Sequence, residues 1–198
     1  MIRVTPAVAT RERILAAALT LFSRYGFKRA SMEDIASEAG LSRAALYLQF
    51  RSKEDIFREL AGGLHEKCLA HAEAALTSDH PLAERLQSAV EAKTVPMIQI
   101  TNSSPHGAEL MDERNRLCGD LATDSEQRFL RLLTGTIQRA DDDREIDLAT
   151  AGLSADSAAD LFAAAVHGLK GTDVSTAAYK KRVAAFIRVF VSGLHSTA

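Results

Sequence analysis

The fold of this chain is decided by the stretch "SMEDIASEAGLSRAALYLQF" (residues 31–50), which holds two short helical patterns joined by a tight turn. Ser31 can cap the first helix together with Asp34, three residues further on, as in a capping box. Gly40 tolerates a left-handed backbone and can end that helix, and Ser42 can cap the second one, which is predicted to reach about residue 48. The stretch is therefore predicted to be a helix-turn-helix.

Amphipathic helices are predicted on either side of this motif. Apolar residues between Thr10 and Tyr25 recur at helical spacing, and Gly26 follows them as a stop signal. On the other side, Ser52 and Asp55 form a Ser-x-x-Asp box at the start of a helix that is predicted to reach about residue 76. We therefore expect residues 1–53 to form a three-helix domain and residues 54–198 to form a second, larger domain.

The two expected domains differ in charge. Residues 1–53 contain nine lysines and arginines against four carboxylates, a net charge of +5, whereas the rest of the chain has a net charge of −7. A basic domain joined to an acidic one is typical of a nucleic-acid-binding module attached to a module of different function. The alternative is that these cations merely form a solvated face.

The second helix of the motif carries side chains that can read DNA. A helix-turn-helix inserts the N-terminal part of its second helix into the major groove. Arg43 stands there and can donate to O6 and N7 of guanine, while Ala44 and Ala45 are small enough to bring their methyl groups against a thymine methyl group. Lys53, in the first turn of the next helix, opposes the helix dipole, which favours a phosphate in front of it.

The run "ILAAALTLFSRYGFKRASMEDIASEAGLSRAALYLQFRSKEDIF" (residues 14–57) resembles the N-terminal DNA-binding domain of the TetR family of bacterial transcriptional regulators. The motifs that carry this resemblance are "LF..YGF", "S..DIA..AG.S...LY..F" and "SKE". The resemblance implies phosphate contacts from Ser31, Tyr47 and Lys53, and base contacts from Arg43 and Ala44.

The chain departs from the family pattern at two positions. Ala45 stands where the family often has a threonine that binds phosphate, and Leu48 stands where an aromatic residue or histidine is common. We therefore expect Arg43, Tyr47 and Gln49 to carry more of the recognition, although Tyr47 could also be a half-buried packing residue. The full set of expected DNA contacts is Ser31, Ser42, Arg43, Ala44, Ala45, Tyr47, Gln49 and Lys53.

The remainder of the chain reads as four or five further helices with no strand, so the expected fold class is all-α. A helix from Pro81 to Ile100 is predicted to kink or break at Pro96, and "TNSSPHG" (residues 101–107) is predicted to be a loop. A short helix to about Leu117 leads into a longer one that ends near Arg139. The acidic stretch of residues 141–156 is predicted to be a connection.

Two strong apolar stripes, in residues 158–169 and 179–194, mark the last two helices. They fit either the core of one chain or a two-fold four-helix bundle, and the family resemblance favours the bundle and hence a homodimer. The expected interface residues are Leu161, Phe162, Ala165, Val183, Phe186, Ile187 and Phe190.

By resemblance, the helices between the two ends of the chain enclose a pocket for a small-molecule effector. The lining set is poor in charge, so a mainly apolar effector is expected, although the same residues could be ordinary core. His106 is not expected to bind a metal, because no cysteine or histidine stands four residues away. The candidate lining residues are Met97, Ile100, His106, Leu110, Met111, Arg114, Phe129 and Leu133.

Composition limits the other possibilities. Hydrophobic residues make up 46% and charged residues 25%, which is the balance of a soluble globular protein rather than a disordered one. No apolar run approaches the roughly 20 residues of a membrane helix, and the N-terminus lacks the apolar core of a signal peptide, so a cytoplasmic protein is expected. Cys68 and Cys118 are isolated, and buried packing explains them better than redox or metal chemistry.

No glycine-rich phosphate loop, metal-ligand cluster or nucleophile–base pair indicates an enzyme, and no cofactor or metal is expected. An architectural DNA-bending protein would not need a second domain with its own core. We therefore expect a homodimeric repressor that binds a palindromic operator in double-stranded DNA and is released by a small molecule. The alternatives are an activator or an effector-independent regulator of the same fold, or a helical enzyme with an incidental basic patch.

Overall fold

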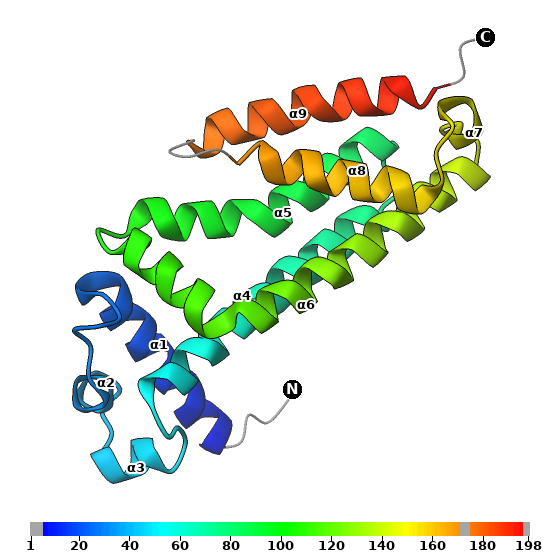
Figure 1. Cartoon of the computed structure of the whole chain (residues 1–198). Coiled ribbons are helices and arrows are strands. Elements are labelled where there is room, and N and C mark those ends of the chain that lie inside the picture. Colours follow the sequence, from blue (N-terminus) through cyan, green and yellow to red (C-terminus); the bar gives the residue numbers. More distant parts are fainter. Residues whose placement is uncertain (1–5, 171–174, 196–198) are drawn as a thin grey trace. The chain divides into compact units, whose positions relative to one another are not determined.

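The computed structural model describes residues 6–170 and 175–195, which form nine α-helices and no strand (Figure 1). The expected all-α fold is confirmed for this part of the chain. Arg3, one of the nine cations counted above, lies outside the described residues. None of the described helices combines the length and the apolar character that a membrane span requires.

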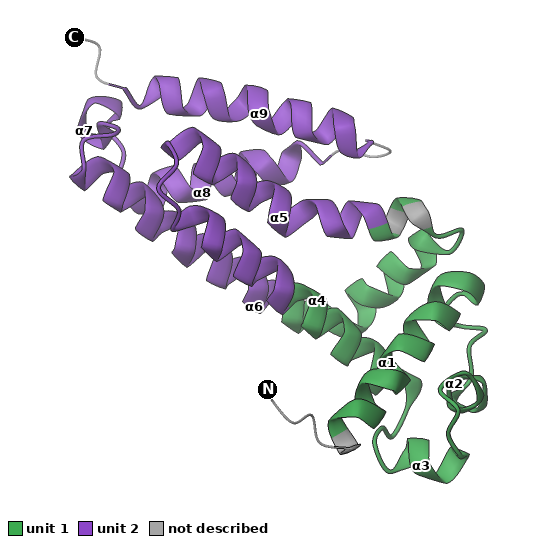
Figure 2. Cartoon of the chain, turned by 180° about the vertical axis from the view of Figure 1, so that it is seen from behind, with its two compact units in different colours: residues 1–65, 100–122 green, residues 66–99, 123–198 purple. Residues whose placement is uncertain are grey.

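The chain divides into two compact units, shown in Figure 2. Unit 1 consists of residues 1–65 and 100–122, and unit 2 of residues 66–99 and 123–198, within the described ranges. Three long helices, α4 (Lys53–Leu76), α5 (Leu82–Ser103) and α6 (Gly107–Asp142), each contribute to both units. A functional boundary after residue 53 stays a prediction, because unit 1 is larger than the helix-turn-helix region.

Unit 1 begins with α1 (Pro6–Tyr25), α2 (Met32–Glu38) and α3 (Arg43–Tyr47). The predicted caps are present: the Ser31 hydroxyl accepts from the backbone N–H of Asp34 at 3.1 Å, and the Asp34 carboxylate accepts from the backbone N–H of Ser31 at 3.0 Å. The Ser42 hydroxyl caps α3 by accepting from the backbone N–H of Ala45 at 3.1 Å. Gly40 has a φ of +63°, so the turn between α2 and α3 uses the left-handed conformation that glycine adopts without strain.

Three phenylalanine rings hold the core of unit 1 together. Phe22 on α1, Phe27 in the turn after it and Phe57 on α4 lie with ring centroids 5.2–5.7 Å apart in tilted or edge-on pairs. Leu46 on α3 is fully buried in the same core. This packing fixes the position of α3, because one turn and a half of helix cannot hold its shape alone.

Two arginines of α1 tie the helix-turn-helix to its surroundings. Arg11 pairs with Glu59 on α4, donates to the carbonyl of Gln49 at 3.2 Å and stacks 4.2 Å from the centroid of the Phe50 ring. Arg13 donates to the carbonyl of Ala39 at the end of α2. These two cations therefore have structural partners.

Helix α5 continues through Pro96, so the predicted break does not occur, while a kink there stays a prediction. The proline costs the helix a backbone hydrogen bond, but Ala92, Val95 and Ile98 around it pack against the core of unit 2 and offset that loss. The expected division of the next helix is confirmed, because α6 consists of two helical segments that join at Cys118, where φ is −130° and ψ is 22°.

Unit 2 is completed by α7 (Leu148–Ala151), α8 (Ala155–Gly168) and α9 (Thr176–Gly193). Helix α7 is a single turn, capped by Asp147, inside the stretch that the sequence predicted to be only a connection. A four-residue helix leaves no periodic signal, which explains why the pattern missed it.

We expect Phe57→Ala to lower the free energy of unfolding by about 3–5 kcal/mol, because it removes one member of the three-ring core. Urea unfolding followed by circular dichroism measures this loss. The control Leu19→Ala alters a leucine of α1 that is 51% exposed and should change stability by less than about 0.5 kcal/mol. Equal effects of the two variants would contradict the assignment of this core.

Candidate nucleic-acid interface

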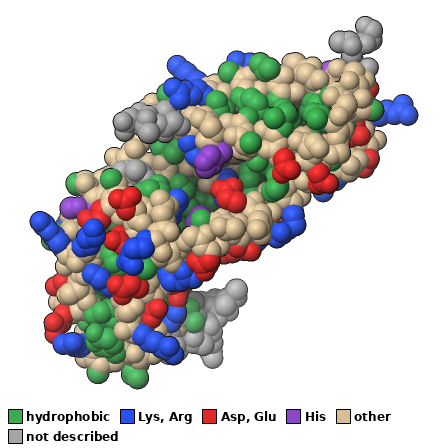
Figure 3. All heavy atoms as spheres, viewed as in Figure 1, with side chains coloured by type: hydrophobic (Ala, Val, Ile, Leu, Met, Phe, Trp, Pro, Cys, Tyr) green, Lys and Arg blue, Asp and Glu red, His purple; other side chains and the backbone are tan. Residues whose placement is uncertain are grey.

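Helix α3 exposes both polar and apolar side chains to solvent. Arg43, Ala44 and Tyr47 are exposed, and Leu48 just after the helix is 84% exposed. Figure 3 shows hydrophobic side chains over α3, at the lower left of the molecule. Most of the predicted base-reading residues therefore share one accessible face, held rigid from behind by the buried Leu46.

Arg43 is paired within this surface. Its guanidinium donates to Glu33 on α2 at 2.9 Å and lies 5.6 Å from the centroid of the Tyr47 ring. Contacts with Tyr47 and with Glu33 raise the pKa of the arginine. The pair is open to water and holds the side chain only weakly, so a guanine can replace Glu33 at modest cost.

Ser31 and Ser42, both predicted to bind DNA, are exposed and serve as helix caps. The Ser31 hydroxyl also donates to Asp34 at 2.6 Å, and these hydrogen bonds lower the pKa of the Asp34 carboxyl. Ala45 and Gln49 are half-buried at the edge of the α3 surface. The DNA contacts of these four residues stay predictions.

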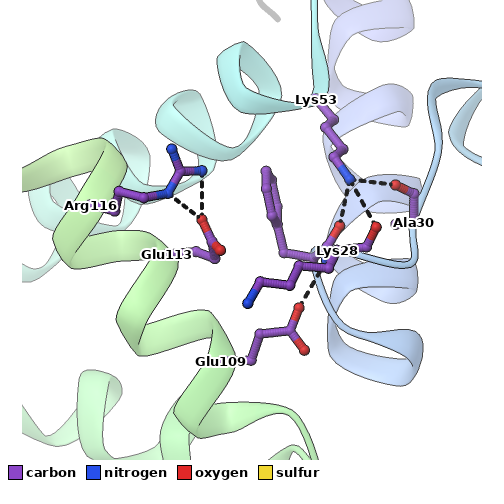
Figure 4. A network of polar contacts seen from close by, with 7 residues as sticks. Lys28, Ala30, Lys53, Glu109, Glu113 and Arg116 are labelled. Atoms are coloured by element: carbon purple, nitrogen blue, oxygen red, sulfur yellow. Dashed lines mark hydrogen bonds and ion pairs between the residues drawn. The ribbon is translucent and has the colours of Figure 1, made fainter.

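Lys53 has a different environment from the one the sequence led us to expect. Its ammonium donates to the carbonyls of Phe27, Lys28 and Ala30 at 2.9, 3.1 and 2.9 Å, and lies 4.6 Å from the centroid of the Phe27 ring (Figure 4). All three protons of the ammonium are therefore used inside unit 1. These carbonyls explain a lysine that opposes the helix dipole, and a phosphate contact from it stays a prediction.

Other cations are better exposed than Lys53. Lys28 and Arg29 lie in the turn after α1, and Arg51 lies in the turn before α4. Sequence reasoning missed them as candidates for phosphate binding because they fall outside the helix-turn-helix pattern. Their position in turns next to the helices of the motif could have indicated a role in phosphate binding.

The start of α6 is bound to the turn that follows α1. Glu109 accepts from the backbone N–H of Lys28 at 2.8 Å, as Figure 4 shows. Gly26 leaves room for that carboxylate, because a Cβ there would lie 2.5 Å from a Glu109 oxygen. His106 lies 3.7 Å from Glu109, and the Ser104 hydroxyl donates to the carbonyl of Ser23 at 2.8 Å.

An ion pair between Arg58 and Asp120 joins helices α4 and α6 in unit 1. The Arg58 guanidinium binds both carboxylate oxygens of Asp120, at 2.8 and 2.7 Å, and also donates to the carbonyl of Leu117. These hydrogen bonds lower the pKa of Asp120 to about 2. The carboxylate therefore stays ionised throughout the physiological pH range, and it loses its charge only near pH 2.

The predicted effector residues are divided between the two units. Ile100, His106, Leu110, Met111 and Arg114 belong to unit 1, whereas Met97, Phe129 and Leu133 belong to unit 2. Leu110 is part of the core of unit 1, and Phe129 and Leu133 are part of the core of unit 2. Their role in binding an effector stays a prediction.

The predicted interface residues fall into two groups. Phe162, Val183, Ile187 and Phe190 are buried in the core of unit 2, because this side of α8 and α9 packs against the unit itself. Ala165 and Phe186 are half-buried, and Leu161 is 54% exposed.

Val189, which is not among the predicted interface residues, is 73% exposed on α9. Figure 3 shows hydrophobic side chains gathered at the surface over α8 and α9. Leu161 and Val189 are therefore large apolar side chains of α8 and α9 that the described structure leaves exposed, and the predicted dimer interface stays a prediction.

Residues 14–60 match the family described as "Bacterial regulatory proteins, tetR family". The chain is 44% identical over 54 residues to the HTH-type transcriptional regulator AcrR of Shigella flexneri, which covers 27% of this chain and 25% of that protein. It is 31% identical over 119 residues to the uncharacterized HTH-type transcriptional regulator YdgC of Bacillus subtilis, which covers 58% of this chain and 61% of that protein. The matches thus span between a quarter and three fifths of the length of these curated relatives.

Solved structures resemble the whole fold. SmeT, the repressor of the Stenotrophomonas maltophilia multidrug efflux pump SmeDEF, superposes with a TM-score of 0.68 at 19% identity, covering 97% of this chain and 93% of that one. A structure of SmeT in complex with triclosan superposes with a TM-score of 0.69 at 20% identity, covering 96% and 93% of the two chains. At this identity the likeness shows a common fold.

We expect Lys53→Met to lower the free energy of unfolding by about 1–3 kcal/mol, because it leaves carbonyls of the turn after α1 without their donor. Thermal and urea unfolding measure this change. The control Arg51→Met removes an exposed cation beside it and should leave stability unchanged. An unchanged stability of Lys53→Met, together with a salt slope of DNA binding reduced by about 0.9, would instead establish a phosphate contact.

Proposed function

Because the chain belongs to the TetR family of bacterial regulatory proteins, we propose that it is a homodimeric transcriptional repressor that leaves a palindromic operator when a small molecule binds. The observation that carries this proposal is the exposed surface of α3, with Arg43, Ala44 and Tyr47 on one rigid face. Arginine in this position can donate two hydrogen bonds to guanine in the major groove.

The shortness of α3 supports a dimer. A recognition helix of five residues meets too few base pairs for specific binding, whereas two copies related by a two-fold axis read a palindrome. The surface that supports such a pairing comprises Leu161 and Ala165 on α8 and Val189 on α9. Small and apolar residues let helices of two chains approach closely, as in a four-helix bundle.

A structural relative supports release by a small molecule. SmeT, which shares the fold, is a repressor and has a solved structure in complex with triclosan, so this fold can combine repression with the binding of a small molecule. In the present chain α4 runs from the helix-turn-helix into unit 2, and Glu109 and Arg58 bind α6 to unit 1. A ligand that moves α4 or α6 would shift α3, and by linkage it would bind the DNA complex more weakly.

The proposal is tested by footprinting the purified protein on the DNA around its own gene. A regulator should protect one palindrome, whereas an architectural protein would bind with little sequence preference and an enzyme would turn over a substrate without DNA. An activator or an effector-independent regulator would protect the same site, and transcription assays with and without ligand would separate these from a repressor.

Arg43→Ala should weaken binding to the protected site by about 1–3 kcal/mol and relax the base preference at one position in each half-site. Binding to random DNA should change little, because base contacts contribute little there. The comparison variant Glu33→Gln keeps Arg43 but removes its competitor, so it should strengthen operator binding. Equal losses of Arg43→Ala on specific and random DNA would refute its role as a base reader.

Val189→Asp should convert the dimer into a monomer and abolish tight operator binding, because it buries an unpaired charge in the proposed interface. The side chain is exposed within the chain, so the fold should survive, which circular dichroism can verify. Leu19→Asp introduces the same charge at an exposed leucine of α1 and should keep the native mass in light scattering. A Val189→Asp protein that remained a dimer would rule out this interface.

A further inference from the structure

Unit 2 contains a buried cation that neither the fold nor the DNA contacts require. Only 7% of the Lys93 side chain, on α5, is exposed. A buried ammonium is costly unless it is closely paired and its remaining protons are bonded. Lys93 pairs with Glu126 on α6 at 3.4 Å, which is longer than the roughly 2.7–2.9 Å of a strong charge-assisted hydrogen bond.

The partner of this lysine differs from it in exposure. The Glu126 side chain is 59% exposed, so its carboxylate reaches the ammonium from the surface and can swing back into water at little cost. The lysine is held inside, because Ala89 and Val90 before it and Val95 after it pack in the core of unit 2. A carboxylate from another molecule could therefore take the place of Glu126.

Lys93 on α5 lies close to side chains of α4 and α6. Its ammonium is 5.8 Å from the centroid of the Phe129 ring on α6. Burial raises the pKa of the Cys68 thiol on α4, and the charge of Lys93 acts on that pKa in the opposite direction. The adjacent Thr94 lies beside Tyr179 on α9. The surroundings are therefore apolar and aromatic, with a cation in their middle.

Two buried hydroxyl groups occur in the same unit without a hydrogen-bond partner of ordinary geometry among the residues that the structure describes. Ser125, one residue before Glu126, is 2% exposed, and Tyr179 is fully buried. Burial raises the pKa of the Tyr179 hydroxyl, and Glu126 and Glu91 act in the same direction, while Thr94 opposes them. The Tyr179 hydroxyl therefore stays protonated at neutral pH and can donate.

We propose that Lys93 binds the carboxylate of an amphipathic monocarboxylic acid, whose apolar part packs against Phe129 while Glu126 turns out to solvent. Ser125 and Tyr179 supply further donors to the acid. The inference rests on the proposed function, since this acid would be the effector of the regulator. It adds one negative charge to the mainly apolar ligand that the sequence led us to expect.

The test uses the full-length protein and two matched pairs of probes, 2-naphthoate with 2-naphthamide and decanoate with decanamide. In isothermal titration calorimetry at neutral pH, at least one acid should bind about tenfold or more tightly than its amide. Lys93→Met should bring the acid down to the level of the amide. Glu126→Gln should strengthen acid binding, because it removes the internal competitor.

Lys67→Met is the matched control, because Lys67 is an exposed lysine of α4 in the same unit and should leave the preference for acids unchanged. If Lys93→Met does not fold, as judged by circular dichroism, Glu126→Gln decides on its own: unchanged acid binding would overturn the proposal. Equal binding of acid and amide by the unaltered protein, absence of acid binding, or an acid preference retained in folded Lys93→Met would overturn it as well.

The proposed function can fail separately from this site. If an acid binds in a Lys93-dependent way but leaves the operator complex intact, the acid site is supported and its role as the effector site is refuted. If a neutral ligand releases the operator and neither acid binds, the proposed function is supported and the acid site is refuted. Acid-dependent release that is lost in Lys93→Met would support both.

Discussion

The three hydrogen bonds from Lys53 to the turn after α1 are the constraint on which the DNA-binding surface depends. They join the start of α4 to the segment that leads into α2, so the two ends of the helix-turn-helix are held together. Because α2 and α3 are too short to be stable alone, their orientation is fixed by these hydrogen bonds and by the packing of the phenylalanine rings.

The same turn is held from its other side by Glu109. The lysine binds carbonyl groups of the turn and the carboxylate binds a backbone N–H, so each charge meets the partner of opposite polarity. This arrangement connects the first segment of α6 with the DNA-binding surface inside one compact unit. Phe27 of this turn and Leu110 of α6 also belong to the core that Leu46 and Phe57 share, so these elements pack as one body.

The interior of unit 2 is mostly apolar. Among its described residues the buried polar side chains include Lys93, Thr94, Ser125, Thr136 and Tyr179. A buried polar group lowers stability unless it is hydrogen-bonded, and the proposed acid would supply that partner to Lys93, Ser125 and Tyr179.

The sequence by itself determined the all-α class, the caps of α2 and α3, the exposed side of α3 and the division of α6 near residue 117. Each depends on residues a few positions apart, whose spacing the sequence displays. The tertiary structure alone decided where the ammonium groups of Lys53 and Lys93 lie, and that Phe162 and Ile187 belong to the core while Val189 is exposed. These outcomes depend on partners that are distant along the chain, such as Phe27 for Lys53 and Glu126 for Lys93, and an apolar stripe does not reveal which of its edges meets its own unit.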